Sequence, residues 1–163
     1  MEPFLFWLFA ITSVLGSLGV VVSRNPIRGA LWLIASLFSV AILFVLLQAH
    51  LLAALEVLVY AGAVMVLFLF VIMLLNLRDE ELGPRRFTLV KFLGVLAAAY
   101  LLKVLAPPLM AAAGSPATLP DNFGTVEGIG AVLFRDYLLP FELTSLLLLI
   151  AVVGAVVLAK RKI

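Results

Sequence analysis

Apolar stretches about 20 residues long recur along this chain, and short segments that carry most of its charge separate them. The first stretch, from Pro3 to Val22, contains no charged residue. Because a helix needs about 20 apolar residues to cross the hydrocarbon core of a bilayer, each stretch predicts a membrane-spanning helix. The composition agrees, since 66% of the residues are apolar and only 12% are charged, whereas about a quarter are charged in a soluble domain. We therefore predict an all-α integral membrane protein.

Five such helices are predicted within a single membrane domain, residues 1–163. Their expected bounds are about 3–22, 27–47, 51–77, 87–106 and 137–159. Asn25-Pro26 predicts the turn before the second helix, and Pro107-Pro108 predicts the end of the fourth. Residues 107–136 are expected to form an outer loop, in which Thr125 to Phe134 has the pattern of a short helix lying on the membrane surface.

Lysine and arginine are distributed unevenly between the two ends of these helices. Lys103 and Arg135 fall on one side, and the other nine of the eleven fall on the opposite side. Those nine are Arg24, Arg28, Arg78, Arg85, Arg86, Lys91, Lys160, Arg161 and Lys162. Because cytoplasmic loops are enriched in Lys and Arg, the sequence predicts an outer N-terminus and a cytoplasmic C-terminus.

This chain does not contain the residues that several kinds of chemistry require. It has no cysteine, which excludes disulfides, thiol nucleophiles and Fe–S ligation by cysteine, and its single histidine, His50, lies in a predicted outer turn. No phosphate-binding glycine loop and no metal-ligand cluster is recognisable. The net charge of +2 reflects the orientation signal, so it does not indicate nucleic-acid binding. We expect no metal or cofactor on this chain, and we interpret it as one subunit of something larger.

Glu56 is the most informative polar residue, because it is predicted to lie inside the third helix. A carboxylate costs about 2.5–3.5 kcal/mol at the middle of a bilayer, so it usually faces a bundle interior, water or a partner. Tyr60 follows four residues later on the same helix face, which makes the two residues candidates for a proton path. The alternative is that Glu56 is solvated near the interface and that Tyr60 only packs.

Small residues follow Glu56 in the same predicted helix. They allow neighbouring helices to approach closely, and a glycine among them lowers the cost of a local break or π-bulge. Close packing by itself also explains the run, which reads Tyr60-Ala61-Gly62-Ala63-Val64.

Glu142, near the start of the fifth helix, is a third candidate acid. A glutamate in a first helical turn is more simply explained by the helix dipole than by a proton relay. The hydroxyl groups of Ser13, Ser17, Ser36 and Ser39 are expected to bond to their own helix backbone, which requires no function.

The third predicted helix resembles a known family. From Glu56 to Met73 the sequence EVLVYAGAVMVLFLFVIM resembles the signature of the NuoJ-type membrane subunit of respiratory complex I, the bacterial counterpart of the sixth mitochondrially encoded subunit. Asn25-Pro26 with Ala30-Leu31 resembles the start of that family's second helix, and Phe141-Glu142 with the leucines that follow resembles its fifth. The likeness covers about two-thirds of the chain, and the fourth helix contributes no motif to it.

This resemblance implies a membrane-arm subunit of a proton-pumping NADH:quinone oxidoreductase in the bacterial cytoplasmic (inner) membrane. Such a subunit binds no redox centre itself, while the complex uses FMN, Fe–S clusters, NADH and quinone. NuoA-, NuoH-, NuoK- and NuoN-like subunits are the expected neighbours, together with the lipid bilayer.

The family's third helix also implies a mechanism. It carries a π-bulge that switches to regular winding, and this change makes and breaks a proton path. By resemblance the hinge lies at Tyr60, Ala61, Gly62 and Ala63, and Glu56 is an acid on the path. We interpret Val64 and Met65 as an aliphatic gate that the rotation would move.

Two further interpretations remain open at this point. The chain would be a stand-alone small proton-coupled transporter if Glu56 were its coupling acid, and it would then need a homodimer to enclose a substrate cavity. Alternatively, it would be a purely structural linker subunit without a role in proton movement.

Overall fold

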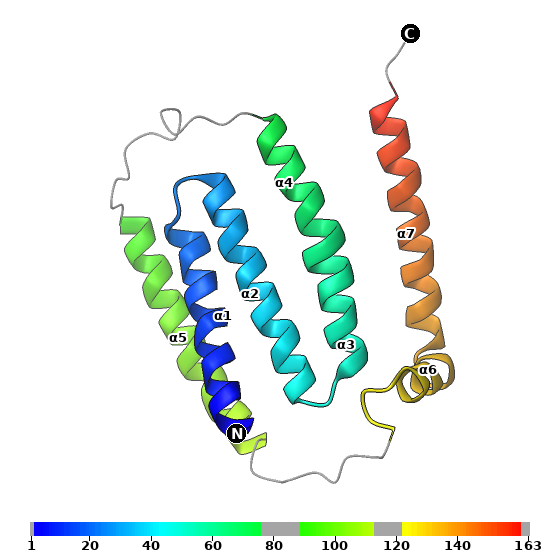
Figure 1. Cartoon of the computed structure of the whole chain (residues 1–163), viewed down its shortest axis with the longest axis horizontal. Coiled ribbons are helices and arrows are strands. Elements are labelled where there is room, and N and C mark those ends of the chain that lie inside the picture. The colour runs from blue at the N-terminus through cyan, green and yellow to red at the C-terminus, as the bar shows by residue number, and fades with distance from the viewer. Residues whose placement is uncertain (1, 76–88, 113–121, 161–163) are drawn as a thin grey trace.

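The computed structural model describes residues 2–75, 89–112 and 122–160, and every regular element in these ranges is a helix (Figure 1). The elements are α1 (Glu2–Val22), α2 (Pro26–Leu46), α3 (His50–Leu55), η1 (Glu56–Val64), α4 (Met65–Leu74), α5 (Leu89–Ala112), α6 (Val126–Arg135) and α7 (Leu138–Ala159). α3, η1 and α4 follow one another directly and form one continuous helix. Five helices of the described residues are long and apolar enough to cross a membrane: α1, α2, this composite helix, α5 and α7.

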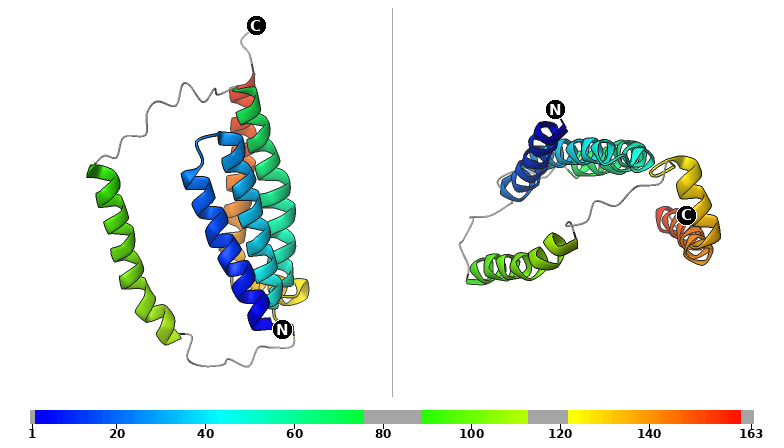
Figure 2. Two further views of the ribbon diagram at one scale, coloured as in Figure 1. Left: turned by 60° about the vertical axis from the view of Figure 1, so that its left-hand side comes forward. Right: turned by 90° about the horizontal axis from the view of Figure 1, so that it is seen from below.

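Three of these spanning helices form a packed layer. α1 packs along α2, and α2 packs against all three parts of the composite helix. In the view from below, these three lie in one row, whereas α5 stands off one side of the row and α6 with α7 lies beyond its end (Figure 2). We call α1, α2 and the composite helix α3–η1–α4 the packed layer.

The turn between α1 and α2 is fixed by local chemistry. The side-chain oxygen of Asn25 accepts hydrogen bonds from the backbone N–H groups of Ile27 and Arg28, at 2.9 and 3.3 Å. Pro26 occupies the first helical position, where its missing N–H costs nothing. The turn predicted from Asn25-Pro26 is therefore confirmed.

Glycines bring α1 close to α2. A β-carbon at Gly16 would lie 3.0 Å from the β-carbon of Ser36, and one at Gly19 would lie 2.6 Å from the indole ring of Trp32. Both values are shorter than an ordinary carbon–carbon contact of about 3.5–4.0 Å. Only a residue without a side chain permits this approach, which is the usual role of small residues between spanning helices.

Hydroxyl groups then join α1 to α2. The hydroxyl of Ser36 donates to the carbonyl oxygen of Ser13 at 3.0 Å and lies 3.1 Å from the hydroxyl of Ser17. The hydroxyl of Thr12 donates to that of Ser39 at 3.1 Å. The prediction that these serines bond to their own helix backbone was incomplete. Ser17 and Ser39 do bond to their own backbone, but the close approach of the two helices also brings hydroxyls within reach across the interface.

α5 differs from its expected bounds in a way that corrects the sequence analysis. We predicted that Pro107-Pro108 would end this helix at residue 106, but the helix continues through both prolines to Ala112. A proline removes a backbone donor and crowds the carbonyl four residues earlier, yet its fixed φ of about −65° is helical. Leu109 and Met110, which follow, are good helix formers, so one further turn is added beyond the prolines.

α6 lies within the expected outer loop and begins at a capped end. The hydroxyl of Thr125 accepts from the N–H of Gly128 at 3.1 Å and donates to the carbonyl of Asn122 at 2.8 Å. α6 is seen nearly end-on in Figure 1 while α7 runs lengthwise in the plane of the picture, so the two helices meet at a steep angle. Phe134 and Phe141 hold this corner with rings 5.2 Å apart at 63°.

Candidate functional site

The composite helix is wound differently at its centre. Over the nine residues of η1, Glu56–Val64, it is a π-helix, and the N–H of Met65 bonds to the carbonyl of Tyr60, five residues earlier. An α-helix would use the carbonyl four residues earlier. Valine and glycine are weak helix formers, and η1 contains both, so the sequence there resists this change of winding less than an alanine- or leucine-rich one would.

Gly62 is the glycine of η1. A β-carbon at this residue would lie 3.1 Å from the carbonyl oxygen of Val57, which is again five residues earlier. A side chain at position 62 would therefore crowd the backbone in the π register. Glycine avoids this contact and so lowers the free-energy cost of the π-helical winding of η1.

The structure divides the predicted hinge and gate residues between two faces. Ala61 and Met65 are buried towards the packed layer, with 8% and 4% of their surface exposed. Tyr60 and Val64 face outward, 54% and 49% exposed, as do the exposed Gly62 and Ala63. The two residues expected to form one gate are thus adjacent in sequence but lie in different surroundings.

Met65 belongs to the core of the packed layer. It clusters with Ala30 of α2 and Ile72 of α4, and Leu33 and Leu69 pack against this cluster. Moving Met65 therefore requires the contact between α2 and α4 to change. Val64 has no such restriction, since its side chain lies on the outward face.

Glu56 is the first residue of η1 and is half-buried. Within the described residues, its carboxylate has no hydrogen-bond or ion-pair partner, and neither has the hydroxyl of Tyr60. A carboxylate at a membrane-spanning position is stable only next to water, a cation or a polar partner. The structure thus places Glu56 and Tyr60 on one short segment. No described residue of this chain provides a hydrogen-bond or ion-pair partner for either side chain.

Glu142 lies on the expected helix, α7, but further from its start than expected. α7 begins at Leu138, so Glu142 is one turn inside it and not in the first turn. The explanation by the helix dipole therefore loses its basis, because that effect is confined to the terminal turn. α7 packs against α6, whereas η1 packs against α2 and its two flanking helices, so packing does not join Glu142 to Glu56.

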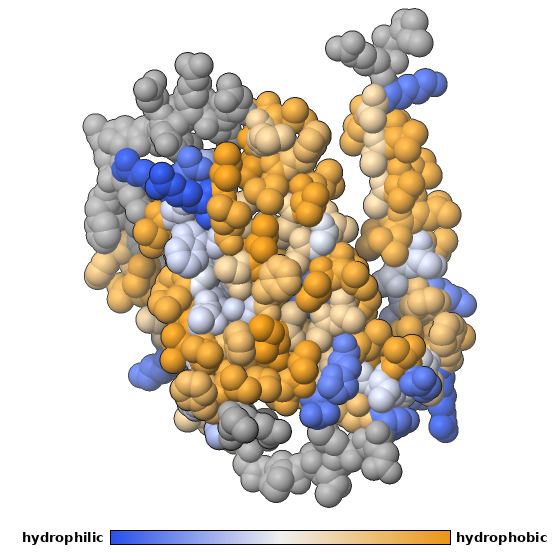
Figure 3. Space-filling view, in the orientation of Figure 1, coloured by the Kyte–Doolittle hydropathy of each residue, from blue (hydrophilic) through white to orange (hydrophobic). Residues whose placement is uncertain are grey.

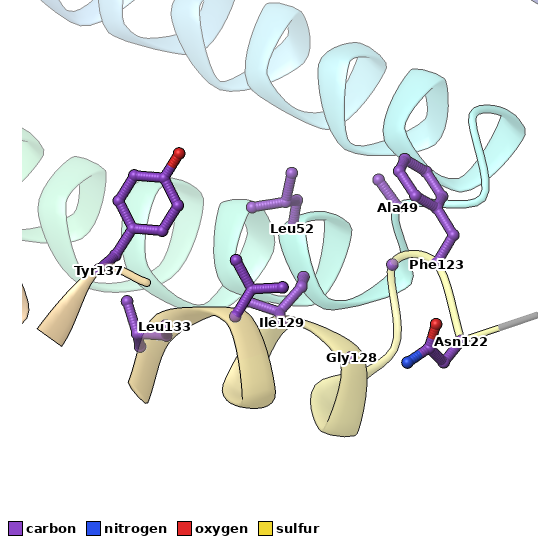
Figure 4. Close-up of a pocket in the computed structure, with 10 residues that line it drawn as sticks. Ala49, Leu52, Asn122, Phe123, Gly128, Ile129, Leu133 and Tyr137 are labelled. Carbon is purple, nitrogen blue, oxygen red and sulfur yellow. The ribbon is translucent and has the colours of Figure 1, made fainter. Parts of the chain in front are cut away.

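A pocket at one end of the composite helix was missed by the sequence analysis. It has a volume of about 450 Å³, with Leu52 of α3 facing Ile129 and Leu133 of α6, and with Phe123 and Tyr137 at its two ends (Figure 4). The only sequence signal was the amphipathic pattern of residues 125–134. Nothing in that pattern says which helix its apolar face will cover.

The wall of this pocket is fixed by Gly124. Its φ of +70° is in the left-handed region, and a β-carbon there would overlap the carbonyl of Gln48. Its own carbonyl accepts a hydrogen bond from the N–H of Leu51 at 3.1 Å, which satisfies a free donor in the first turn of α3. This contact ties the segment before α6 to the packed layer, one turn of helix before Glu56.

Metal ligands are not gathered anywhere in the described residues. No group of three or more His, Asp or Glu side chains there could hold a metal ion. The polar residues of η1 are instead a single carboxylate and a single phenol, a pair that suits proton transfer better than ligation.

Comparison with known proteins assigns the family. Residues 16–158 match the family described as NADH-ubiquinone/plastoquinone oxidoreductase chain 6. The chain belongs to this family. The match begins in the last third of α1 and reaches all but the last residue of α7, so it includes η1 and the whole of α2 and the composite helix.

Individual relatives agree with this assignment. The chain is 41% identical to NADH-quinone oxidoreductase subunit J of Rhodobacter capsulatus, over 97% of its own length and 81% of the relative. It is 45% identical to the organellar chromatophore NAD(P)H-quinone oxidoreductase subunit 6 of Paulinella chromatophora, over 96% and 77%. It is 39% identical to subunit J of Pseudomonas aeruginosa, over 93% of each chain. The resemblance inferred from the third helix is confirmed.

Proposed function

We propose that this chain is a multi-pass subunit of a proton-pumping NADH:quinone oxidoreductase and that its third helix couples quinone reduction to proton translocation. The bacterial relatives named above are subunits of NADH-quinone oxidoreductases, which supports membership of the complex. The observation that carries the coupling role is η1, a π-wound segment in a spanning helix that begins at a half-buried carboxylate. Electron transfer through FMN, Fe–S clusters and quinone belongs to other subunits in this proposal.

The arrangement in the membrane is part of the same proposal. The excess of Lys and Arg on one side favours an outer N-terminus and a cytoplasmic C-terminus, and the bacterial relatives favour the cytoplasmic membrane of a bacterium. α6 would then lie on the outer surface of the bilayer, with its apolar face against the packed layer. NuoA-, NuoH-, NuoK- and NuoN-like chains are the proposed neighbours, and the exposed apolar faces of α5 and α7 are where such neighbours would pack.

Coupling would use the one-residue difference between the two windings. If η1 changed from π to α winding, residues on one side of it would rotate by about 100° relative to the other side. Val64 now faces outward and Met65 faces the core, so a shift of one residue would exchange their surroundings. That exchange would replace an aliphatic contact beside Tyr60 and open or close a water-filled path to Glu56.

Substitution of Gly62 tests this mechanism directly. In Gly62→Val, the added atoms would crowd the carbonyl of Val57 in the π register and shift the balance towards α winding. Overpacking costs about 1–3 kcal/mol, which corresponds to roughly a fivefold to hundredfold change in the balance of the two forms. We expect NADH:quinone reduction and proton pumping in inverted membrane vesicles to fall together by a similar factor.

The control for this experiment is Gly130→Val in α6, outside the spanning helices, where no described atom would lie within 4 Å of a β-carbon. Assembly is measured separately, by native electrophoresis and by NADH oxidation with a water-soluble electron acceptor. A Gly62→Val complex that assembles and pumps at the normal rate would show that the winding of η1 is not part of coupling.

Substitution of Glu56 separates a coupling subunit from a structural linker. We expect Glu56→Gln to slow proton pumping while the amount of assembled complex stays unchanged, because glutamine keeps the shape but cannot release a proton. Glu127→Gln, at an exposed position of α6, is the matched control. Normal pumping with Glu56→Gln would favour the linker.

The stand-alone transporter is tested without any substitution. Native electrophoresis of a mild detergent extract should show the chain migrating with NADH-oxidising activity. Migration as a small homodimer that lacks this activity would support the transporter and contradict membership of the complex.

A further inference from the structure

A second polar site lies at the other end of the packed layer, at the turn between α1 and α2. A cavity of about 620 Å³ opens there, between the last turn of α1 and the first two turns of α2. Its lining includes Ser23, Arg24, Arg28 and Trp32. We propose that this cavity binds the headgroup of an acidic phospholipid, an interaction independent of the proposed coupling function.

The charge of the cavity comes from its two arginines. Arg24 lies in the turn and Arg28 lies in the first turn of α2, and both are exposed. Among the described residues, neither side chain is paired with a carboxylate. A guanidinium group presents two parallel donors that match the oxygens of a phosphate, so two of them in one cavity suit a phosphodiester.

The backbone at the start of α2 does not supply this anion affinity. Asn25 already accepts hydrogen bonds from the free N–H groups of Ile27 and Arg28. The end of the helix is therefore capped from within the chain, and the two guanidinium groups carry the interaction with the ligand.

An apolar depression continues from the charged one, which distinguishes a lipid from a free phosphate. This second cavity has a volume of about 350 Å³ and is lined by Arg28, Leu31, Trp32 and Ala35. It shares Arg28 and Trp32 with the first cavity, so charged and apolar walls adjoin along the same face of α2. An acyl chain lying on Leu31 and Ala35 would place its phosphate between the two arginines.

The indole of Trp32 is the common wall of the two cavities, and its position is fixed by the fold. The ring lies against Gly19 of α1, where a β-carbon would approach it to 2.6 Å. The residue is nevertheless 49% exposed, so one edge of the ring stays available to a ligand. A tryptophan held at the boundary between charged and apolar surface is typical of the level of the lipid headgroups.

The surface around the turn also combines hydrophilic and apolar residues, as the two cavities do. Figure 3 shows hydrophilic residues gathered over the α1–α2 turn, next to the apolar flank of the packed layer. From the sequence, this turn falls on the side of the membrane where nine of the eleven Lys and Arg residues are expected. With the proposed orientation this is the cytoplasmic leaflet, whose anionic lipids attract basic segments next to spanning helices.

The test uses the purified complex in vesicles of phosphatidylcholine that contain a small fraction of phosphatidylglycerol with a photoactivatable acyl chain. After illumination, peptides are mapped by mass spectrometry. We expect labelling between Gly19 and Ala35. An attraction of about 1 kcal/mol per arginine corresponds to roughly a fivefold loss of labelling for Arg24→Gln or Arg28→Gln and roughly 25-fold for both.

Two controls and one competition complete the design. Arg135→Gln, at the other end of the molecule, should label as the unsubstituted chain does, because its exposed side chain lies outside both cavities. Unlabelled phosphatidylglycerol in excess should suppress the labelling, whereas excess phosphatidylcholine or inorganic phosphate should not.

Three results would overturn the proposal. Equal labelling by photoactivatable phosphatidylcholine would mean that the headgroup is not recognised. Suppression by inorganic phosphate would mean that the site takes a free anion. Absence of labelling in the assembled complex, together with loss of assembly in the double variant, would identify the turn as a contact with another subunit. None of these readouts depends on quinone reduction, so they are separable from failure of the coupling mechanism.

Discussion

The packed layer and the two helices outside it have similar hydropathy but opposite surroundings. α2 and the composite helix bury residues such as Ala30, Ser36 and Met65, and glycines let α1 approach α2 to contact distance. α7 has no buried residue, and the same holds for the described side chains of the spanning part of α5. Among the described residues, the packed layer is distinguished by small and hydroxylic residues that lie between helices, whereas the hydroxyls of α7 bond within their own helix.

This difference follows from the physics of the bilayer. Lipid tails are as apolar as leucine, so apolar side chains by themselves give helices no reason to associate within the membrane. Close backbone approach and hydrogen bonds provide that reason between α1 and α2, and small buried residues such as Ala53 and Ala61 let the composite helix lie close to α2. α5 and α7 can therefore find their packing partners in other chains, which is what a subunit of a larger complex requires.

The largest effect is expected from Gly16→Val in α1. Its β-carbon would meet both the side chain and the backbone of Ser36, so we expect the free energy of unfolding to fall by about 1–3 kcal/mol. Titration of the purified chain with SDS, followed by tryptophan fluorescence, measures this. Gly154→Val in α7 should leave the isolated chain unchanged. An equal loss in both variants would contradict the distinction between the packed layer and α7.

A second prediction concerns the connection between the packed layer and α6. Gly124→Ala places a side chain at a left-handed φ and against the carbonyl of Gln48, so we expect a loss of about 1 kcal/mol or more. Hydrogen–deuterium exchange should rise at the N–H of Leu51, whose acceptor is displaced. Gly130→Ala, within α6, has open space around its β-carbon and serves as control. Unchanged exchange at Leu51 would show that this hydrogen bond does not hold the segment.

The smallest expected effect comes from the hydroxyl groups. Ser36→Ala removes the hydrogen bonds of Ser36 to Ser13 and Ser17 of α1 and leaves that of Thr12 to Ser39, and such bonds within a membrane are worth about 0.6 kcal/mol on average. Ser145→Ala in α7 removes a hydrogen bond of 2.7 Å to the carbonyl of Glu142 in the same helix. The SDS titration should detect the first substitution and not the second. If the two variants unfolded alike, the bonds between helices would not be what stabilises the packed layer.

The candidate site was predicted from the sequence only as a set of residues. Glu56 and the small residues after Tyr60 stood out by their chemistry, and the family followed from the string that contains them. That Val64 faces outward while Met65 lies in the core was not predictable, because it depends on the winding of η1 and on where α2 lies. The α6 pocket escaped for a related reason, since its walls come from segments far apart in the sequence.

The sequence by itself determined five apolar segments, the turn at Asn25-Pro26 and the family. Each of these features can be recognised from one short stretch of sequence. The spanning helices can be recognised in this way because in lipid every backbone polar group must be satisfied within its own helix. Tertiary structure decided which serines reach across to another helix and which face of η1 turns inward. Those outcomes depend on the distance between neighbouring helices, and no residue carries that information alone.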